Sequence, residues 1–316
     1  MIDLSKIKTY PLKERKNKAG IRDFVKLCGK PEDYEKLMGI FPDILAVSNI
    51  KSCVEAIRKS RENGKPFVLM MGAHSIKCGL SPLIIEMMEK GIITHFATNG
   101  ASAIHDFEIA YMGETSEDVA IALEDGTFGM AYETAHYLND AYIKGAAQNK
   151  GMGGSVSDLI DEMNLPYRDY SIFYRAAKAG VKATIHTAIG TDIIHQHPGC
   201  SGEALGKVSH IDFHRFADTL SELDGGTVMN LGSAVLLPEV FLKALTIVRN
   251  LGYNTKNFTA VNIDMVDHYR PRVNVLNRPT SGGGKKLFLQ GPIELFLPLI
   301  VHGLFAKMGL EFGQWK

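Results

Sequence analysis

Largely apolar runs of seven or eight residues alternate with amphipathic segments along the chain after residue 50. The apolar runs end in glycine or short polar residues and predict buried strands. Apolar residues at helical spacing predict the helices between them. The expected strands are 66–72, 92–98, 181–188, 226–232 and 258–264, and the expected helices are 50–63, 81–91, 131–149, 170–179, 210–223, 238–252 and 291–309. This alternation predicts an α/β fold with a doubly wound, mostly parallel sheet covered by helices on both faces.

Prolines indicate where two of these helices begin and where a third one bends. Ser81-Pro82 predicts a helix start, and Pro238 is expected at the first position of its helix, where the missing N–H costs nothing. Pro298 lies inside the closing helix and predicts a bend there.

The domain organisation is simple. No stretch rich in proline, glycine or serine divides the chain, so residues 31–316 are predicted to form one domain. Residues 1–30 contain nine Lys and Arg against three Asp and Glu. They are expected to form a basic, solvated arm that packs loosely or against a neighbouring subunit. The arm has no interleaved aromatic residues to favour a nucleic-acid partner.

Composition narrows the class of protein. The 316 residues are 45% hydrophobic and 22% charged, with 35 Lys+Arg against 35 Asp+Glu, which excludes disorder and gives no reason to expect nucleic acid or an acidic membrane as partner. The four cysteines lie far apart in the sequence and are expected to be reduced thiols. The first twenty residues are polar and basic, and the longest apolar runs are far too short to span a bilayer. A cytoplasmic protein is expected.

The strand ends hold the candidate chemistry. In doubly wound sheets, ligands bind beyond the carboxyl ends of the strands. A single glycine there is most simply explained by a turn, but five such loops together favour a crevice that a flat cofactor can enter. The loops are 72–79, 99–102, 189–192, 232–234 and 264–267.

Standard motifs do not identify the ligand. Pro279 and Lys286 break a Walker A pattern, and Val156 stands where the third glycine of GxGxxG belongs. Residues 192–200 contain Asp, two His and Cys, but without any zinc spacing, so a polar pocket or subunit contact is favoured and no metal is expected. Three histidines near strand ends are interpreted as hydrogen-bonding residues more readily than as catalysts: His74, His105 and His186.

Two lysines follow a glycine-rich segment. Lys285 and Lys286 come after Gly282, Gly283 and Gly284, which is compatible with a flexible loop carrying solvated lysines. The alternative is a lysine on a mobile loop over the crevice, where desolvation lowers its pKa and allows it to attack an imine.

Four stretches, in this order and spacing, resemble the deoxyhypusine synthase family, in particular its bacterial deoxyhypusine synthase-like members. The resemblance runs from about residue 20 to the C-terminus and includes a Thr-x-Gly-x turn at residues 98–101 and a Thr-Asp loop at 191–192. The stretches are 64–110, 168–194, 260–286 and 293–306.

The resemblance implies a deoxyhypusine synthase-like NAD-binding fold and a homotetramer. In the family, NAD oxidises spermidine to an imine, and a lysine carries the aminobutyl group to a second amine. By position, Lys285 is the best match for this catalytic lysine, with Lys286 close behind. The residues implied to bind NAD are Gly72, His74, Ser75, Thr98, Asn99, Gly100 and Asp192.

Departures from the family pattern argue against an authentic deoxyhypusine synthase. Pro238-Glu239 replaces a histidine pair, His197 stands where the family has an acidic residue that holds the polyamine, and a glycine replaces the tryptophan before the lysine. The resulting hypothesis is an NAD-dependent transferase that acts on an amine or polyamine through an imine. The alternatives are an NAD-binding protein without the transferase step, or an NAD enzyme with an anionic substrate, favoured by Arg270 and Arg272.

Overall fold

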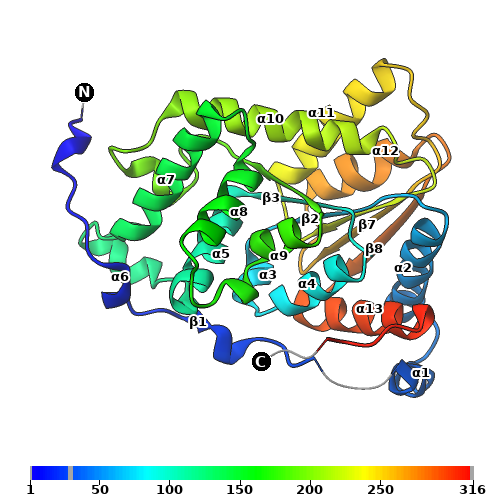
Figure 1. Cartoon of the computed structure of the whole chain (residues 1–316). Coiled ribbons are helices and arrows are strands. Elements are labelled where there is room, and N and C mark those ends of the chain that lie inside the picture. Colours follow the sequence, from blue (N-terminus) through cyan, green and yellow to red (C-terminus); the bar gives the residue numbers. More distant parts are fainter. Residues whose placement is uncertain (1, 28–30, 314–316) are drawn as a thin grey trace.

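A six-stranded parallel sheet forms the centre of the computed structural model, which describes residues 2–27 and 31–313 (Figure 1). The strand order is β5-β3-β2-β6-β7-β8, and every neighbouring pair is parallel. The predicted doubly wound α/β fold is therefore confirmed. The strands are β2 (Phe67–Met71), β3 (His95–Asn99), β5 (Lys182–His186), β6 (Thr227–Leu231), β7 (Thr259–Asp264) and β8 (Lys285–Gln290).

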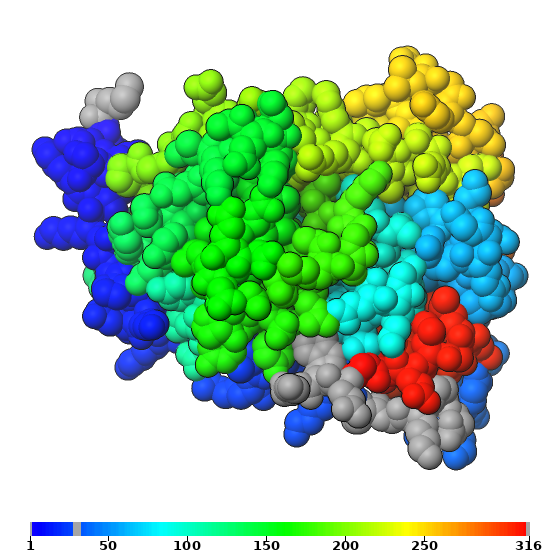
Figure 2. Space-filling model, in the orientation of Figure 1, coloured from blue at the N-terminus to red at the C-terminus, as the bar shows by residue number. Residues whose placement is uncertain are grey.

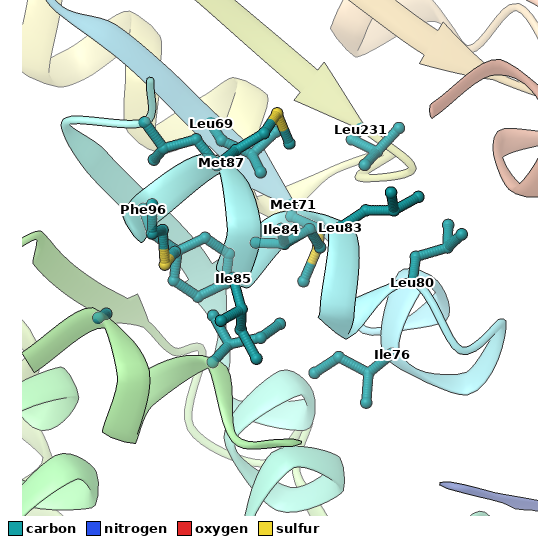
Figure 3. Close-up of a cluster of buried hydrophobic side chains, with 14 of the residues drawn as sticks. Leu69, Met71, Ile76, Leu80, Leu83, Ile84, Ile85, Met87, Phe96 and Leu231 are labelled. Atoms are coloured by element: carbon teal, nitrogen blue, oxygen red, sulfur yellow. The ribbon is translucent and has the colours of Figure 1, made fainter. Parts of the chain in front are cut away.

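The two faces of the sheet carry separate apolar cores. Side chains alternate between the faces of a strand, so Leu69 and Met71 of β2 belong to one cluster while Val68 and Met70 belong to the other. Figure 3 shows the first cluster, in which Ile84 and its neighbours pack beside Leu69 and Met71. Burial on both faces explains why these strands are continuous apolar runs.

Helices cover both faces of the sheet (Figure 1). On one side lie α2, α4, α9 and α13, and on the other lie α10 and α11. No helix in the described ranges is long and apolar enough to cross a bilayer. The longer helices are α1 (Pro31–Gly39), α2 (Leu45–Glu62), α4 (Ser81–Glu89), α5 (Gly100–Met112), α7 (Tyr132–Ala147), α8 (Met152–Glu162), α9 (Ile172–Lys178), α10 (Gly202–Leu220), α11 (Leu236–Asn250) and α13 (Ile293–Met308).

Some helices differ from the sequence pattern. Helices α5 and α8 were not expected, because both begin with small residues that resemble loop composition. Helix α10 begins eight residues before the expected start, where the hydroxyl of Ser201 accepts a hydrogen bond from the N–H of Ala204. Helix α11 begins at Leu236, so Pro238 lies within its first turn and the prediction that it takes the first position is wrong.

The lysine segment is an edge strand and not a mobile loop. Lys285 and Lys286 open β8, which pairs in parallel register with β7 from Thr259 onward. The backbone N–H of Lys285 donates to the carbonyl of Phe258 at 2.9 Å. The mobile loop predicted from the preceding glycines is wrong because the chain enters the sheet directly after them. Prediction from the pattern missed β8 because its first two residues are charged.

The N-terminal segment packs on the domain and is not a loose arm. Leu12 is fully buried, and β1 (Ala19–Gly20) pairs with β4 (Glu114–Thr115) in antiparallel register. Arg15 leaves only 5% of its side chain exposed. Figure 2 shows this segment in blue along one side of the molecule. The expected solvated arm is wrong because burial of Leu12 and of the Arg15 guanidinium anchors it.

Candidate functional site

The point at which the strand order of the sheet reverses lies between β2 and β6. Strands β3 and β5 extend the sheet on one side of β2, and β6, β7 and β8 extend it on the other. At the carboxyl ends of β2 and β6, Gly72 donates its N–H to the carbonyl of Leu231 at 2.9 Å. A Cβ atom on Gly72 would collide with the carbonyl oxygen of Gly232. Two glycine backbones thus meet at the position where doubly wound sheets bind ligands.

A second close approach lies at the start of α5. The Asn99 side chain accepts a hydrogen bond from the N–H of Ser102 at 3.1 Å, and the hydroxyl of Thr98 donates to the carbonyl of Met71 at 2.6 Å. These bonds hold the turn between β3 and α5. A Cβ atom on Gly100 would collide with the carboxylate of Asp192. The fold thus brings together two residues that lie 92 positions apart in the sequence.

Asp192 is a buried carboxylate at this edge. It accepts a hydrogen bond from the hydroxyl of Thr187 at 2.9 Å, and one of its oxygens lies 3.7 Å from Nε2 of His195. Burial raises the pKa of Asp192, although Thr187 and His195 oppose that shift. Nε2 of His195 is buried without a hydrogen-bond partner. Nε2 of His195 is therefore a buried polar atom that the described chain does not satisfy by itself.

The short helix α3 (His74–Lys77) follows Gly72. Ser75 is buried, and its hydroxyl has no hydrogen-bond partner. His74 is exposed, and its Nε2 lies 3.3 Å from the sulfur of Cys78. The structure thus gathers the residues implied to bind NAD at one edge of the sheet, and their role remains a prediction.

A cavity of about 230 Å³ opens between α3, α5 and the N-terminal segment. Ala101 and Asp192 link it to the start of α5. Its lining contains several ionisable groups. The polar and charged lining residues are Arg15, Lys77, His105, Glu108, Ser116, Glu117, Thr191 and Asp192.

A buried ion pair forms one wall of the cavity. The Arg15 guanidinium donates to the carboxylate of Glu108, which is only 1% exposed, and lies 3.8 Å from the carboxylate of Glu117. Burial favours protonation of Glu108, but the charge and hydrogen bond of Arg15 outweigh it and hold the pKa below its usual value. Glu108 is therefore an ionised carboxylate in the interior.

This carboxylate determines the tautomer of His105. Thr115 donates its hydroxyl proton to Glu108, and its oxygen lies 2.7 Å from Nδ1 of His105. Because the Thr115 proton is already committed, Nδ1 must be the donor in this second bond. Burial lowers the pKa of His105 to about 4, so the ring is neutral at pH 7. Its Nε2 is then a bare acceptor.

The two lysines proposed as catalytic do not join this site. Lys285 lines a separate surface hollow with Gly225 and Thr259, at the amino ends of the strands. Lys286 donates to the side chain of Asn277 at 2.9 Å. A five-residue strand separates the two edges of the sheet by about 17 Å. The placement over the crevice is therefore wrong.

The side chains of segment 192–200 have contacts of their own. His197 bonds through Nε2 to the carbonyl of Gly129 at 2.8 Å, and the part of the chain that the structure describes contains no group of three metal-ligating side chains.

The sequence predicts His105 as a hydrogen-bonding residue, but it does not predict the cavity or the partners of His105. His105 and Glu108 lie three positions apart, which would have placed them on one face of a helix had residues 100–112 been recognised as helical. No local pattern connects Arg15 to Glu108, because the pair spans 93 residues. Lys77 carries no signal beyond its place in a strand-end loop.

Comparison with known proteins supports the fold. Neither the protein-family models nor the curated proteins give a match to this chain. A candidate deoxyhypusine synthase from Entamoeba histolytica aligns with a TM-score of 0.52 at 14% identity, over 92% of this chain and 100% of that protein. A conserved candidate LOR/SDH protein from Methanococcus maripaludis S2 gives 0.52 at 17% identity, over 91% and 71%.

A third structure is the ternary complex of AgrE with ornithine and NAD+, with a TM-score of 0.52 and 13% identity. The alignment covers 88% of this chain but 34% of AgrE, so this chain spans about a third of that protein. These structural similarities confirm the deoxyhypusine synthase-like fold implied by the sequence.

Proposed function

We propose that this chain binds NAD at the carboxyl edge of its sheet and oxidises a small amine, without covalent transfer through a lysine. The observation that carries the proposal is the pair of glycine approaches at that edge. Gly72 meets Gly232 across the switch point, and Gly100 meets Asp192 at the start of α5. Glycines at such positions let a flat dinucleotide reach backbone N–H groups.

The residues at this edge fit NAD. Asp192 has a buried carboxylate that can accept hydrogen bonds from ribose hydroxyls, as acidic residues do in other dinucleotide folds. The unpartnered hydroxyl of Ser75 and Nε2 of His195 add polar atoms for a ligand to satisfy. Thr98 and Asn99 use their side chains to hold the turn, so their contribution would come from the backbone around Gly100. When bound, NAD would accept a hydride from the carbon that carries the amine.

Two structures with this fold support the proposal by analogy. AgrE was solved with ornithine and NAD+, and the Entamoeba protein is a candidate deoxyhypusine synthase. Ornithine is an amine, and deoxyhypusine synthases act on an amine. The AgrE complex also contains NAD+. Covalent transfer is left out because Lys285 and Lys286 lie at the amino ends of the strands. We expect the protein to be located in the cytoplasm.

An anionic substrate is less well supported. Arg270 lies 3.2 Å from the carboxylate of Glu239, and Arg272 lies 2.9 Å from that of Asp267. Arginines that are already paired attract an anion weakly. A protein that binds NAD without catalysis remains the alternative, and the two measurements below separate it from an enzyme.

The first measurement is calorimetry with NAD. Asp192→Ala is expected to weaken binding about 10- to 100-fold, because a charge-assisted hydrogen bond is lost. The matched control is Asp140→Ala, which removes an exposed carboxylate on α7. Equal affinities for the wild type and Asp192→Ala would remove this residue from the site.

The second measurement follows NADH absorbance with NAD and a panel of mono-, di- and polyamines. Amine-dependent NADH formation supports the enzyme. NAD binding without NADH formation from any amine would favour the binding protein instead.

A further inference from the structure

Two groups on the cavity wall lack an internal partner. The ammonium of Lys77 and Nε2 of His105 have no hydrogen bond or ion pair among residues 2–27 and 31–313. Both line the cavity between α3 and α5. Lys77 is half-buried, so its charge is only partly hydrated.

The other charged groups of the wall are already engaged. Arg15 donates through Nε to the side chain of Asn17 at 2.8 Å and through Nη2 to Glu108. Glu117 accepts hydrogen bonds from the N–H of Gly129 at 3.1 Å and from a tyrosine hydroxyl. Asp192 accepts a hydrogen bond from the hydroxyl of Thr187 at 2.9 Å and is assigned to NAD in the proposed function. Apart from Asp192, the wall offers a ligand one cation and one neutral acceptor.

We propose that this cavity binds a small molecule carrying both a carboxylate and an amine, with its carboxylate at Lys77 and its amine N–H donating to Nε2 of His105. This assignment rests on the proposed function and deepens it by naming the substrate class. It also makes His105 the residue that positions the nitrogen next to the reacting carbon.

The chain Arg15–Glu108–Thr115–His105 explains why the acceptor is fixed. Each proton in it points toward Glu108, so rotation or tautomer exchange of His105 would break the bond to Thr115. A carboxylate cannot take the place of the amine, because Nε2 has no proton to donate to it. The charges that face His105 are those of Lys77, Arg15 and Glu108. Burial disfavours the charged ring and outweighs the attraction of Glu108, and the two cations add to the effect of burial, so the pKa is lowered and Nε2 stays an acceptor.

The test uses 5-aminopentanoate and its N-trimethyl analogue, which has a carboxylate but no N–H. Calorimetry on the whole chain is expected to show that the wild type prefers the amine. His105→Phe keeps a ring in the site but removes the acceptor, and the preference should fall about 10- to 100-fold. His105→Gln returns an acceptor oxygen and should restore part of the preference. The control His136→Phe alters an exposed histidine on α7.

Lys77→Met is expected to weaken both compounds alike, whereas Lys90→Met, an exposed lysine after α4, should leave both unchanged. A preference that survives His105→Phe would overturn the role of His105. Failure of the wild type to bind either compound would overturn the assignment of the cavity.

Nitrogen-15 NMR gives a readout that needs neither NAD nor turnover. The ring of His105 is expected in the Nδ1–H tautomer, and Thr115→Val should release it to a mixture while Thr115→Ser retains it. An Nε2–H tautomer in the wild type would overturn the inference even if NAD binds. If the wild type shows the Nδ1–H tautomer and the amine preference but does not bind NAD, only the proposed function would be overturned.

Discussion

At the scale of single residues, glycines set how closely the strand ends approach. Gly72 lies against the carbonyl of Gly232, and Gly100 lies against the carboxylate of Asp192. In both cases the neighbour occupies the space that a Cβ would need. The constraint at these two positions comes from contacts with distant parts of the chain and not from a turn conformation.

Gly72→Ala should therefore destabilise the protein. The added methyl group meets backbone, which cannot rotate away, so we expect the free energy of unfolding to fall by about 1–3 kcal/mol. Urea denaturation followed by circular dichroism measures it. Gly206→Ala is the matched control, because nothing lies within 4 Å of a Cβ there and alanine favours the helix by up to about 1 kcal/mol. Equal stabilities for the two variants would contradict the close approach.

At the scale of elements, two segments have structural roles that their composition does not predict. The basic N-terminal segment supplies Leu12 to the interior and Arg15 to the cavity wall. The glycine-lysine segment becomes the edge strand β8. Both carry the charge pattern of exposed chain, and long-range pairing places them in the fold.

Arg15→Met should cost about 3–5 kcal/mol of unfolding free energy, because it leaves the Glu108 carboxylate buried without its cation. Lys13→Met, at an exposed position of the same segment, should change it by no more than about 0.5 kcal/mol. Thermal denaturation of both variants distinguishes a structural anchor from a loose arm. Combining Arg15→Met with Glu108→Gln should recover part of the loss, since the uncompensated charge is then removed.

Lys285→Ala and Lys286→Ala should each leave amine-dependent NADH formation within about twofold of the wild type, as expected for surface positions away from the site. The reason is their location at the amino ends of the strands. Borohydride trapping with NAD and amines, followed by mass spectrometry, should give no adduct on either residue. An adduct on Lys285 or Lys286 would reinstate covalent transfer.

At the scale of the whole molecule, apolar side chains gather at the carboxyl edge of the sheet. They follow β6 and β7 and begin α13, the same edge that holds the candidate cofactor residues. Exposed apolar groups of this kind often mark protein contacts. These side chains are each more than half exposed: Val235, Met265, Val266, Tyr269 and Leu295.

We expect a homotetramer in solution, with a mass near four times 34.7 kDa by light scattering. Leu295→Glu should lower that mass by placing a charge in a subunit contact, whereas Leu251→Glu, an exposed position after α11, should not. A stable monomer of the wild type at micromolar concentration would contradict the tetramer.

Local patterns in the sequence determined the kind of fold. Apolar runs such as 66–72 and the helical spacing of 81–91 depend on neighbouring residues alone, so the alternation of strands and helices was enough to imply a parallel sheet. The glycine-bearing strand ends likewise implied an edge at which a ligand binds.

The tertiary structure alone decided which of those ends meet. Strand β3 pairs with β5, and this neighbourhood brings Gly100, which follows β3, against Asp192, which follows β5. Lys285 begins β8, so it lies at the opposite, amino edge of the sheet. The bond between Arg15 and Glu108 likewise joins segments 93 residues apart. Such pairings depend on how all the elements pack together, and periodicity within a short window carries no information about them.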